Sequence, residues 1–376
     1  MSSTPFNFRI NFQFNVLFSN LAKQKLATLV LLLLSVFAPV TSTHAQIPDL
    51  SQVQVTRLLD QPIITPGIDP SIGVNIQGPS VIKVPEWVAN QLGAYYLYFA
   101  DHKGDYIRLA YADVITGPWQ IYAPGSLQLE QSHFLTSPPE VSDERIRELE
   151  AERRSDTVQY THDLRTEITS THIASPDVHV DNANQRIVMY YHGLAGLGSQ
   201  HSRVATSTDG IHFDAQPQNL GRTYMRAFAH DDMTYVMSMP GQFYRSRGGF
   251  TDFETGPLLF QSNMRHAGLL QRGDTLYVFW TRVGDVPESI MVSTIDISGD
   301  WQQWKNVGER IVLKPEFEWE GANAPLLPSM RSTAYGLVNQ LRDPAIFVEG
   351  DAIYLFYAVG GESGIALAKI ELGEGQ

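Results

Sequence analysis

The chain has 376 residues, no cysteine, 43% hydrophobic residues and a formal net charge of −13. Its apolar content is enough for a large core, which no disulfide can reinforce, and its 29 glycines and 21 prolines favour a fold with many tight turns. With 40 acidic against 27 basic residues, the sequence offers no basic face for neutralising phosphates. We therefore do not expect nucleic acid as a partner.

The first 45 residues have the pattern of a secretory signal. Lys23 and Lys25 precede an apolar run from Leu26 to Ala38, and small or polar residues follow as far as Ala45. The run is shorter than the ~20 residues that span a bilayer, although a short membrane anchor is the alternative interpretation. The sequence thus predicts a secreted or periplasmic protein whose mature part, residues 46–376, is not inserted in a membrane.

The mature part repeats one pattern five times: a short strand, a turn, an aromatic-rich strand, a second turn and a third strand. The aromatic strands are expected at residues 95–99, 187–191, 235–239, 276–280 and 353–357. The strands before them are expected at 79–84, 176–180, 226–229, 267–270 and 344–348, and the third strands at 107–111, 203–206, 243–245, 290–293 and 365–368. Fourth strands are expected near Trp119, Phe213, Phe253 and Trp301.

Repetition of a four-stranded unit predicts an all-β fold, a five-bladed β-propeller, whose radial closure protects the sheet edges. The fifth unit ends after its third strand because the chain stops at Gln376. The strand-like segment 53–59 is expected to supply the missing fourth strand and to close the ring. A β-sandwich is the alternative fold.

Two stretches interrupt the repeat. Residues 138–155 are rich in charge and predict a helix between the first two units, either a solvated surface element or a lid. Residues 305–340 predict a long loop before the fifth unit, and long loops in compact folds are often functional.

Charged residues gather where the first strand of each unit begins. These strands line the channel of a propeller, so residues far apart in sequence are expected to converge there. The stretches are Gln77-Gly78-Pro79, Ser175-Pro176-Asp177, Tyr224-Met225-Arg226, Arg265-His266 and Arg342-Asp343-Pro344. Such a concentration of charge is difficult to explain as core packing, because unpaired buried charges are costly.

The blade motifs resemble those of a known clan. Strands that open with Asp-Pro-x-Ile/Val and continue through a hairpin into Tyr-x-Leu-x-Tyr are similar to the blades of five-bladed propeller glycosidases of the arabinanase, xylosidase and invertase clan. Residues 342–357 and 176–178 match this style best. The resemblance implies a first-blade Asp as base or nucleophile, a second Asp that orients it and a Glu as acid. Gly78 stands where that first-blade Asp would be.

The candidate catalytic carboxylates are therefore Asp177, Asp343 and Glu320, the last in a Glu-Gly context loosely similar to that of the clan's acid. Each also has a structural interpretation, as an ion-paired blade clamp or an ordinary loop carboxylate. The candidate substrate-binding residues are His102, His192, Arg226, Arg265, His266 and Arg342. We predict no cofactor and no metal ligand set, and leave open a structural cation in the channel.

These patterns predict an exported glycoside hydrolase-like protein that acts on a polysaccharide or oligosaccharide by carboxylate acid–base catalysis. The arginines favour an anionic sugar, because guanidinium pairs with carboxylate or sulfate in a bidentate way. Two alternatives remain: a lyase for uronic-acid polysaccharides, and a carbohydrate-binding propeller without catalysis, for which Gly78 is the direct argument.

Overall fold

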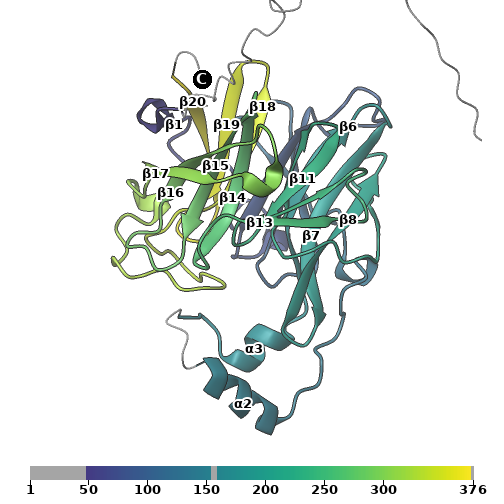
Figure 1. The fold of residues 1–376 in the computed structure, drawn as a ribbon, viewed down its shortest axis with the longest axis vertical. Helices are drawn as coiled ribbons and strands as arrows, with labels where there is room; N and C mark the ends of the chain where they lie inside the picture. The colour runs from purple at the N-terminus through teal and green to yellow at the C-terminus, as the bar shows by residue number, and fades with distance from the viewer. Residues whose placement is uncertain (1–47, 154–158, 374–376) are drawn as a thin grey trace, which may run out of the picture. The chain divides into compact units, whose positions relative to one another are not determined.

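Five four-stranded antiparallel sheets follow one another along the chain in the computed structural model, which describes residues 48–153 and 159–373 (Figure 1). Blade 1 contains β2 (Gln77–Lys83), β3 (Tyr95–Ala100), β4 (Arg108–Ala112) and β5 (Gln120–Tyr122), and blade 2 contains β6 (Ile173–Asp181), β7 (Arg186–Gly196), β8 (Ser199–Ser207) and β9 (Asp214–Ala215). Blade 3 contains β10 (Arg226–His230), β11 (Met233–Ser238), β12 (Gln242–Ser246) and β13 (Glu254–Leu258). Blade 4 contains β14 (Met264–Arg272), β15 (Thr275–Arg282), β16 (Ile290–Asp296) and β17 (Asn306–Leu313), and blade 5 contains β18 (Arg342–Glu349), β19 (Ala352–Ala358), β20 (Ile365–Glu371) and β1 (Gln54–Arg57).

The first two strands of each blade form a hairpin, as predicted. The turn between β10 and β11 consists of Asp231 and Asp232, whose φ angles of 46° and 58° match a tight turn with two left-handed residues. Aromatic and β-branched residues of the second strands then face both sides of each sheet. They pack into five buried clusters, each shared by two neighbouring blades. This sharing makes the ring continuous and confirms the predicted five-bladed propeller.

The N-terminal strand closes the ring. β1 pairs antiparallel with β20, with Gln54 opposite Glu371 and Arg57 opposite Ala368. The prediction that a segment within 53–59 completes the fifth blade is thereby confirmed. The predicted secretory signal, residues 1–45, lies outside the described residues.

The fourth strand of blade 4 departs from the prediction. The segment at Trp301 is a short 3₁₀ helix, η4 (Trp301–Gln303), and the strand is β17, farther along the chain. Asp300 caps the helix by accepting a hydrogen bond at 3.1 Å from the backbone N–H of Gln302, while the buried Trp301 packs between blades 3 and 4. The indole of Trp301 therefore packs in the core from a helical turn rather than from a strand. Part of the expected loop 305–340 forms β17 instead.

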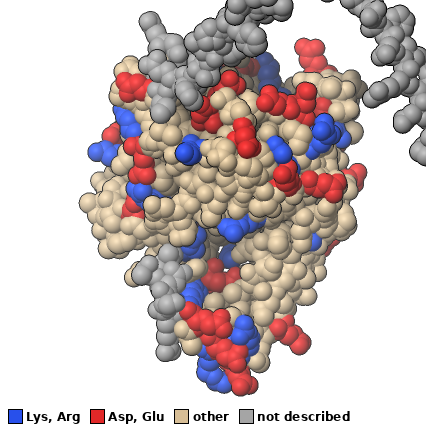
Figure 2. All heavy atoms as spheres, viewed as in Figure 1, with Lys and Arg blue, Asp and Glu red and all other residues tan. Residues whose placement is uncertain are grey.

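The charged segment before blade 2 forms α2 (Asp143–Arg153), as predicted. A second short helix, α3 (Leu164–Thr169), follows later in the chain, and the sequence did not indicate it. Charged side chains of both signs crowd the end of the molecule that α2 forms (Figure 2). The other short helices are η1 (Leu50–Gln52), η2 (Pro70–Ile72), η3 (Leu129–Gln131) and η5 (Glu318–Glu320). Within the described part of the chain, no helix has the length and apolar character needed to cross a membrane.

Candidate active site

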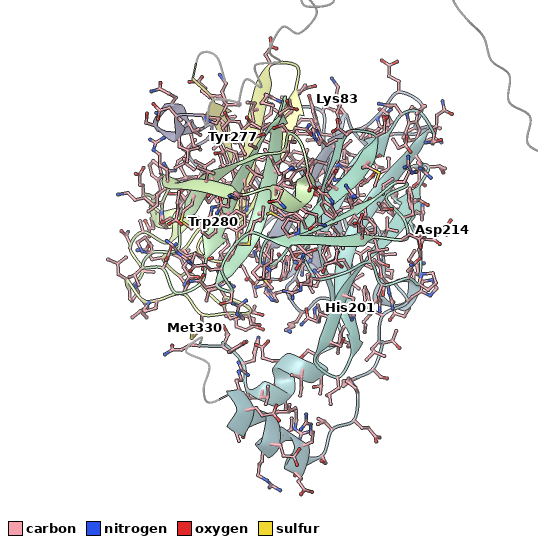
Figure 3. The ribbon with its side chains drawn as sticks, viewed as in Figure 1. Lys83, His201, Asp214, Tyr277, Trp280 and Met330 are labelled. Carbon is pink, nitrogen blue, oxygen red and sulfur yellow. The ribbon has the colours of Figure 1, made fainter. Side chains whose placement is uncertain are left out.

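The inner strands β2, β6, β14 and β18 share an irregularity at their beginning. In each, the pairing with the second strand shifts register and leaves two residues unpaired: Gly78-Pro79, Ser175-Pro176, Arg265-His266 and Asp343-Pro344. The bulges place these residues at one end of the central channel, together with Tyr224, which precedes β10. We call this end the mouth. The carbonyl of Met330, labelled in Figure 3, accepts hydrogen bonds from Arg265 and Arg342 there.

Asp343 and His266 form the centre of the mouth. Both side chains are buried, with 1% and 2% exposed, and Oδ1 of Asp343 contacts Nδ1 of His266. Two such atoms can meet only if one group donates a proton to the other. Burial and the neighbouring Arg265 hold the pKa of His266 well below its usual range, so the imidazole is neutral. Neither oxygen of Asp343 has a well-directed hydrogen bond among the described residues. Because Oδ1 is in contact with His266, Oδ2 is the oxygen that is able to bind a ligand.

A row of rings in tilted and edge-on contact extends from His266 around the mouth. The ring centroids of His266 and Tyr224 are 4.1 Å apart, those of Tyr224 and His192 are 4.3 Å apart, and those of His192 and His172 are 5.7 Å apart. Burial lowers the pKa of His172 to about 3 and that of His192 well below its usual value. Nδ1 of His192 has no partner within the described chain. These neutral imidazoles can exchange hydrogen bonds with hydroxyl groups.

An ion-pair network around Glu362 also holds the mouth, and it includes Arg342, which directly precedes Asp343. Arg342 donates to Oε1 of Glu362 at 2.7 Å, and Asn75 donates to Oε2 of the same carboxylate, also at 2.7 Å. Nδ1 of His102 lies 3.2 Å from Oε1 of Glu362. Burial alone would raise the pKa of Glu362, but His102, Arg342 and Asn75 together lower it to about 2. Glu362 is therefore ionised and committed to its partners.

The two mouth arginines are occupied as well. Nε of Arg265 lies 2.8 Å from Oε1 of Glu288, and both Arg265 and Arg342 also donate to the carbonyl of Ser332. Their positions agree with the predicted convergence of the strand beginnings. Their guanidinium groups, however, donate to acceptors within the protein. Arg265 and Arg342 therefore hold the residues of the mouth in place rather than bind a ligand.

Lys103 and Glu167 complete the mouth, and the sequence analysis singled out neither of them, nor His172, Asn75, Glu288 and Glu362. Nζ of Lys103 lies 3.9 Å from Oε2 of Glu167 on α3, and these side chains are only 13% and 12% exposed. Burial lowers the pKa of Lys103, while Glu167 and Glu362 oppose that shift. Oε1 of Glu167 has no partner among the described residues. Lys103 directly follows the predicted His102, but nothing in the sequence connects either residue with α3.

Comparison with known proteins places the chain in a family. No protein-family model matches the sequence. The chain is 36% identical over 323 residues to the uncharacterized protein R118 of Acanthamoeba polyphaga mimivirus, an alignment that covers 79% of this chain and 84% of that protein. The chain belongs to the R118 family.

Solved structures extend the likeness of this R118-family chain at the level of fold. A member of the GH130 family of mannoside phosphorylases, which contains glycoside hydrolases that target β-1,2-mannosidic linkages in Candida mannan, has a TM-score of 0.55 and 12% identity, with 86% of this chain and 95% of that chain covered. The GH43_1 enzyme from Xanthomonas citri, solved with xylose, has a TM-score of 0.48 and 12% identity, with 84% and 90% covered. The GH130 likeness shows the shared fold and agrees with the resemblance to five-bladed propeller glycosidases.

Asp177 and Arg226 of this R118-family chain lie deeper in the channel and are not part of the mouth. Arg226 donates from Nε to the carbonyl of Ala267 at 3.0 Å and from Nη1 to that of Pro176 at 3.1 Å, and so links two inner strands. Asp177 accepts a hydrogen bond from the backbone N–H of Ala227 at 2.8 Å and has Nη1 of Arg226 at 4.0 Å. The structure therefore does not bring Asp177 together with Asp343 in one constellation.

Glu320 lies at the closure of the ring. Its carboxylate accepts two hydrogen bonds from Arg57, both at 2.8 Å, and one at 3.1 Å from the hydroxyl of Tyr357. The backbone N–H of Glu316 adds a fourth at 2.8 Å. These contacts fit a clamp that joins β1 to η5 and β19, rather than the ordinary loop carboxylate that was the structural alternative for this residue.

No group of three or more candidate metal ligands lies within 48–153 and 159–373. Asp181, which alternates with Asp177 and His179 on one strand, instead pairs with Arg186 at 2.7 Å.

Proposed function

We propose that the protein binds a carbohydrate at the mouth and acts on a glycosidic linkage there, with Asp343 as the proton-donating carboxylate. The observation that carries the proposal is the free Oδ2 of Asp343, buried and held by His266 among groups that can bind hydroxyls. Asp343 is the single carboxylate at the four bulges. The fold that the chain shares with the GH130 structure supports the same class of chemistry.

In this mechanism Asp343 gives its proton to the glycosidic oxygen as the bond to the anomeric carbon breaks. A neutral His266 that donates Nδ1–H to Oδ1 of Asp343 leaves the carboxyl proton on Oδ2, where the linkage would bind. After the step Asp343 regains a proton from solvent.

The attacking water needs a base. Glu362 is bonded through both oxygens, and Glu288 has an arginine near each of its oxygens, at 2.8 and 3.7 Å. Oε1 of Glu167 has no hydrogen-bond partner among the described residues, and only Lys103, at 3.9 Å, lies near its other oxygen, so we assign the water proton to Glu167.

A second candidate is cleavage by inorganic phosphate in place of water. Phosphate supplies its own nucleophilic oxygen, so the reaction needs only one acidic group, which Asp343 provides. The buried ammonium of Lys103, with the neutral imidazoles of His172 and His192 close by, offers a place for an anion. The GH130 structure belongs to a family described as mannoside phosphorylases, which is the reason to test this outcome.

The anionic-sugar hypothesis now depends on Lys103, because Arg265 and Arg342 are occupied by internal acceptors. The lyase alternative needs a base of modest pKa, but burial raises the pKa of Tyr224 above its ordinary value. Tyr224 is thus a poor proton acceptor. Export is proposed from residues 1–45 alone.

The test is a panel of oligosaccharides with mass spectrometry of the products. Added water indicates hydrolysis, a sugar phosphate indicates phosphorolysis, and an unsaturated sugar indicates the lyase. We expect Asp343→Asn to lower the rate by ~10²–10⁴-fold, the usual effect of losing a general acid. Asp181→Asn, a control carboxylate paired with Arg186, should leave the rate unchanged. Binding without turnover on the whole panel, or full activity of Asp343→Asn, would contradict the proposal.

A further inference from the structure

The channel widens into a cavity of about 660 Å³ on the side of Arg226 away from the mouth. Inner strands of all five blades line it, at Ser80–Val84, Asp177–Val180, Arg226–Ala227, Gly268–Leu269 and Ala345–Val348. Lys83, which lines this cavity, and Met330, which belongs to the mouth, are at opposite ends of the propeller (Figure 3). The volume is in the range of sites that enclose small organic ligands.

The charged side chains of the cavity are paired or exposed. In the interior, Oδ1 of Asp177 lies 4.0 Å from Nη1 of Arg226, which also donates to two backbone carbonyls. Toward the solvent, Lys83 pairs with Glu349 at 2.7 Å, and the exposed Glu86 adds a further carboxylate to the lining. The lining thus has no excess positive charge. Because a buried charge without a partner is costly, the cavity favours an uncharged ligand.

His179 places an open ring nitrogen in the cavity. Oδ2 of Asp177 accepts a hydrogen bond from the backbone N–H of Ala227 at 2.8 Å and lies 2.6 Å from Nε2 of His179. Since a carboxylate oxygen can only accept, Nε2 carries the proton of this contact. Nδ1 of the half-buried ring has no partner among the described residues. A neutral Nδ1 accepts a hydrogen bond and a protonated one donates it, and a hydroxyl group satisfies either form.

The remaining walls are mostly apolar. Their aliphatic and aromatic surface comes from Val81, Val178, Leu269, Ile346 and Phe347. Trp87 stands at the side, where its indole Nε1 donates to Asn182 at 3.0 Å. The exposed side chains of Lys83 and Val348 mark the end at which the cavity opens to solvent. Apolar walls around an open ring nitrogen are typical of a site for an apolar molecule with one polar group.

We propose that this cavity is a second ligand site, which binds an uncharged alcohol with its hydroxyl group on Nδ1 of His179 and its apolar body against the channel walls. The site uses neither Asp343 nor His266, and Arg226 separates it from the mouth. It therefore does not depend on the proposed glycosidic chemistry.

Three eight-carbon probes test the preference for an uncharged ligand. 1-Octanol, octanoate and octylammonium share one apolar chain and differ in the charge of the head group. NMR titration of the purified protein follows the indole N–H signal of Trp87, which is assigned by its loss in Trp87→Phe. We expect 1-octanol to shift this signal saturably and to bind at least ~10-fold more tightly than either charged probe, because each charge would leave water without a free partner. An unshifted signal, or equal or tighter binding of a charged probe, would overturn the proposal.

His179→Phe isolates the hydrogen bond when 1-octanol is compared with 1-fluorooctane. The fluorine is close to a hydroxyl in size, but it does not donate and accepts only weakly. The ratio of the two affinities, alcohol over fluoride, should fall ~5-fold in the variant, the equivalent of about 1 kcal/mol for one hydrogen bond. Added apolar contact with the phenyl ring affects both probes and cancels in the ratio. An unchanged ratio would contradict the assignment of Nδ1.

His212→Phe is the matched control, because Nδ1 of His212 pairs with Asp209 at 2.8 Å outside the cavity, and its ratio should equal that of the native protein. The Trp87 signal of the native protein tests the site even if His179→Phe folds poorly. Asp343→Asn should bind 1-octanol with native affinity, which separates this proposal from the proposed catalysis. Loss of 1-octanol binding in Asp343→Asn would place the probe at the mouth and overturn the assignment. Displacement of 1-octanol by a neutral oligosaccharide would also overturn it.

Discussion

Gly78 occupies a position that an aspartate could adopt only with strain. Its φ is 64°, and an added Cβ would lie 3.1 Å from Cα of Ser175 on the next inner strand. We expect Gly78→Asp to lower the free energy of unfolding by roughly 1–3 kcal/mol and to add no activity. Urea unfolding measures the loss.

Gly273→Ala separates backbone strain from the steric contact with Ser175. Gly273 has a φ of 53°, but no atom lies within 4 Å of an added Cβ. It should cost about 1 kcal/mol from backbone strain alone. Equal losses in the two variants would mean that the contact with Ser175 is unimportant.

His172 couples stability to pH. In the native protein its pKa is about 3, against 6.5 for an ordinary histidine. Between these two values the unfolded chain binds a proton at this histidine and the native protein does not. The free energy of unfolding is therefore unaffected by His172 above pH 6.5 and decreases as the pH falls from 6.5 towards 3, by about 2 kcal/mol at pH 5.

The measurement is urea unfolding at pH 7 and pH 5. His172→Gln should lose about 2 kcal/mol less than the native protein over this interval. His212→Gln, a variant of a surface histidine, should behave like the native protein. The same loss in native protein and His172→Gln would refute the assignment.

The residues of the mouth could be predicted only where they lie on repeated strands. Asp343 and His266 follow from the blade pattern, because the beginnings of the inner strands must converge. His192 follows from its place directly after the aromatic segment of a second strand. Lys103 and Glu167 meet through α3, whose packing no local pattern reveals. Asp177 directly follows its bulge, yet that one step along the strand puts it beyond the carbonyl of Pro176, to which Arg226 donates.

At the scale of elements, hairpins with strong turns were predictable and irregular outer strands were not. The pair β10–β11 follows from its aspartate turn and aromatic strand. β17 is half-exposed along most of its length and lacks a distinct apolar pattern, so the large Trp301 misleadingly marked the strand. Outer strands bury little side-chain area, and the sequence constrains them weakly.

The contact between β1 and η5 gives a prediction at this scale. Glu320 is fully buried and bonded to Arg57 through both carboxylate oxygens. We expect Glu320→Gln to cost about 1.5–3 kcal/mol, because it removes two charge-assisted hydrogen bonds from Arg57, which keeps its pair with Glu316 at 2.9 Å. The folded variant should keep its activity, since the carboxylate of Glu320 is bonded to Arg57 and Tyr357 rather than to a residue of the mouth. Thermal and urea unfolding measure the first effect, and rates per folded molecule the second.

Glu349→Gln is the control for Glu320→Gln, because it breaks the exposed pair with Lys83 and should cost less than about 1 kcal/mol. A Glu320→Gln protein that is stable but inactive would instead support the catalytic role considered from the sequence.

At the scale of the whole molecule, the ring depends on contacts between the two ends of the chain. Four of the five buried clusters join blades that are neighbours in sequence, and the fifth joins blade 5 to blade 1. β1 reinforces this last closure by covering the edge of β20. Because the mouth takes residues from every blade, an open ring would disperse it.

Removal of β1 should therefore impair both stability and activity. A chain that starts at Leu58 lacks the buried Val53, the Arg57 pair with Glu320 and the strand that covers β20. It also lacks the carbonyls of Leu50 and Val53, to which Arg310 donates at 2.7 and 2.6 Å. We expect its Tm to fall by ~5 °C or more relative to a chain that starts at Ile47, and its exposed β20 edge to promote association. Calorimetry and size-exclusion chromatography compare the two chains, and equal Tm and elution would show that the ring closes without β1.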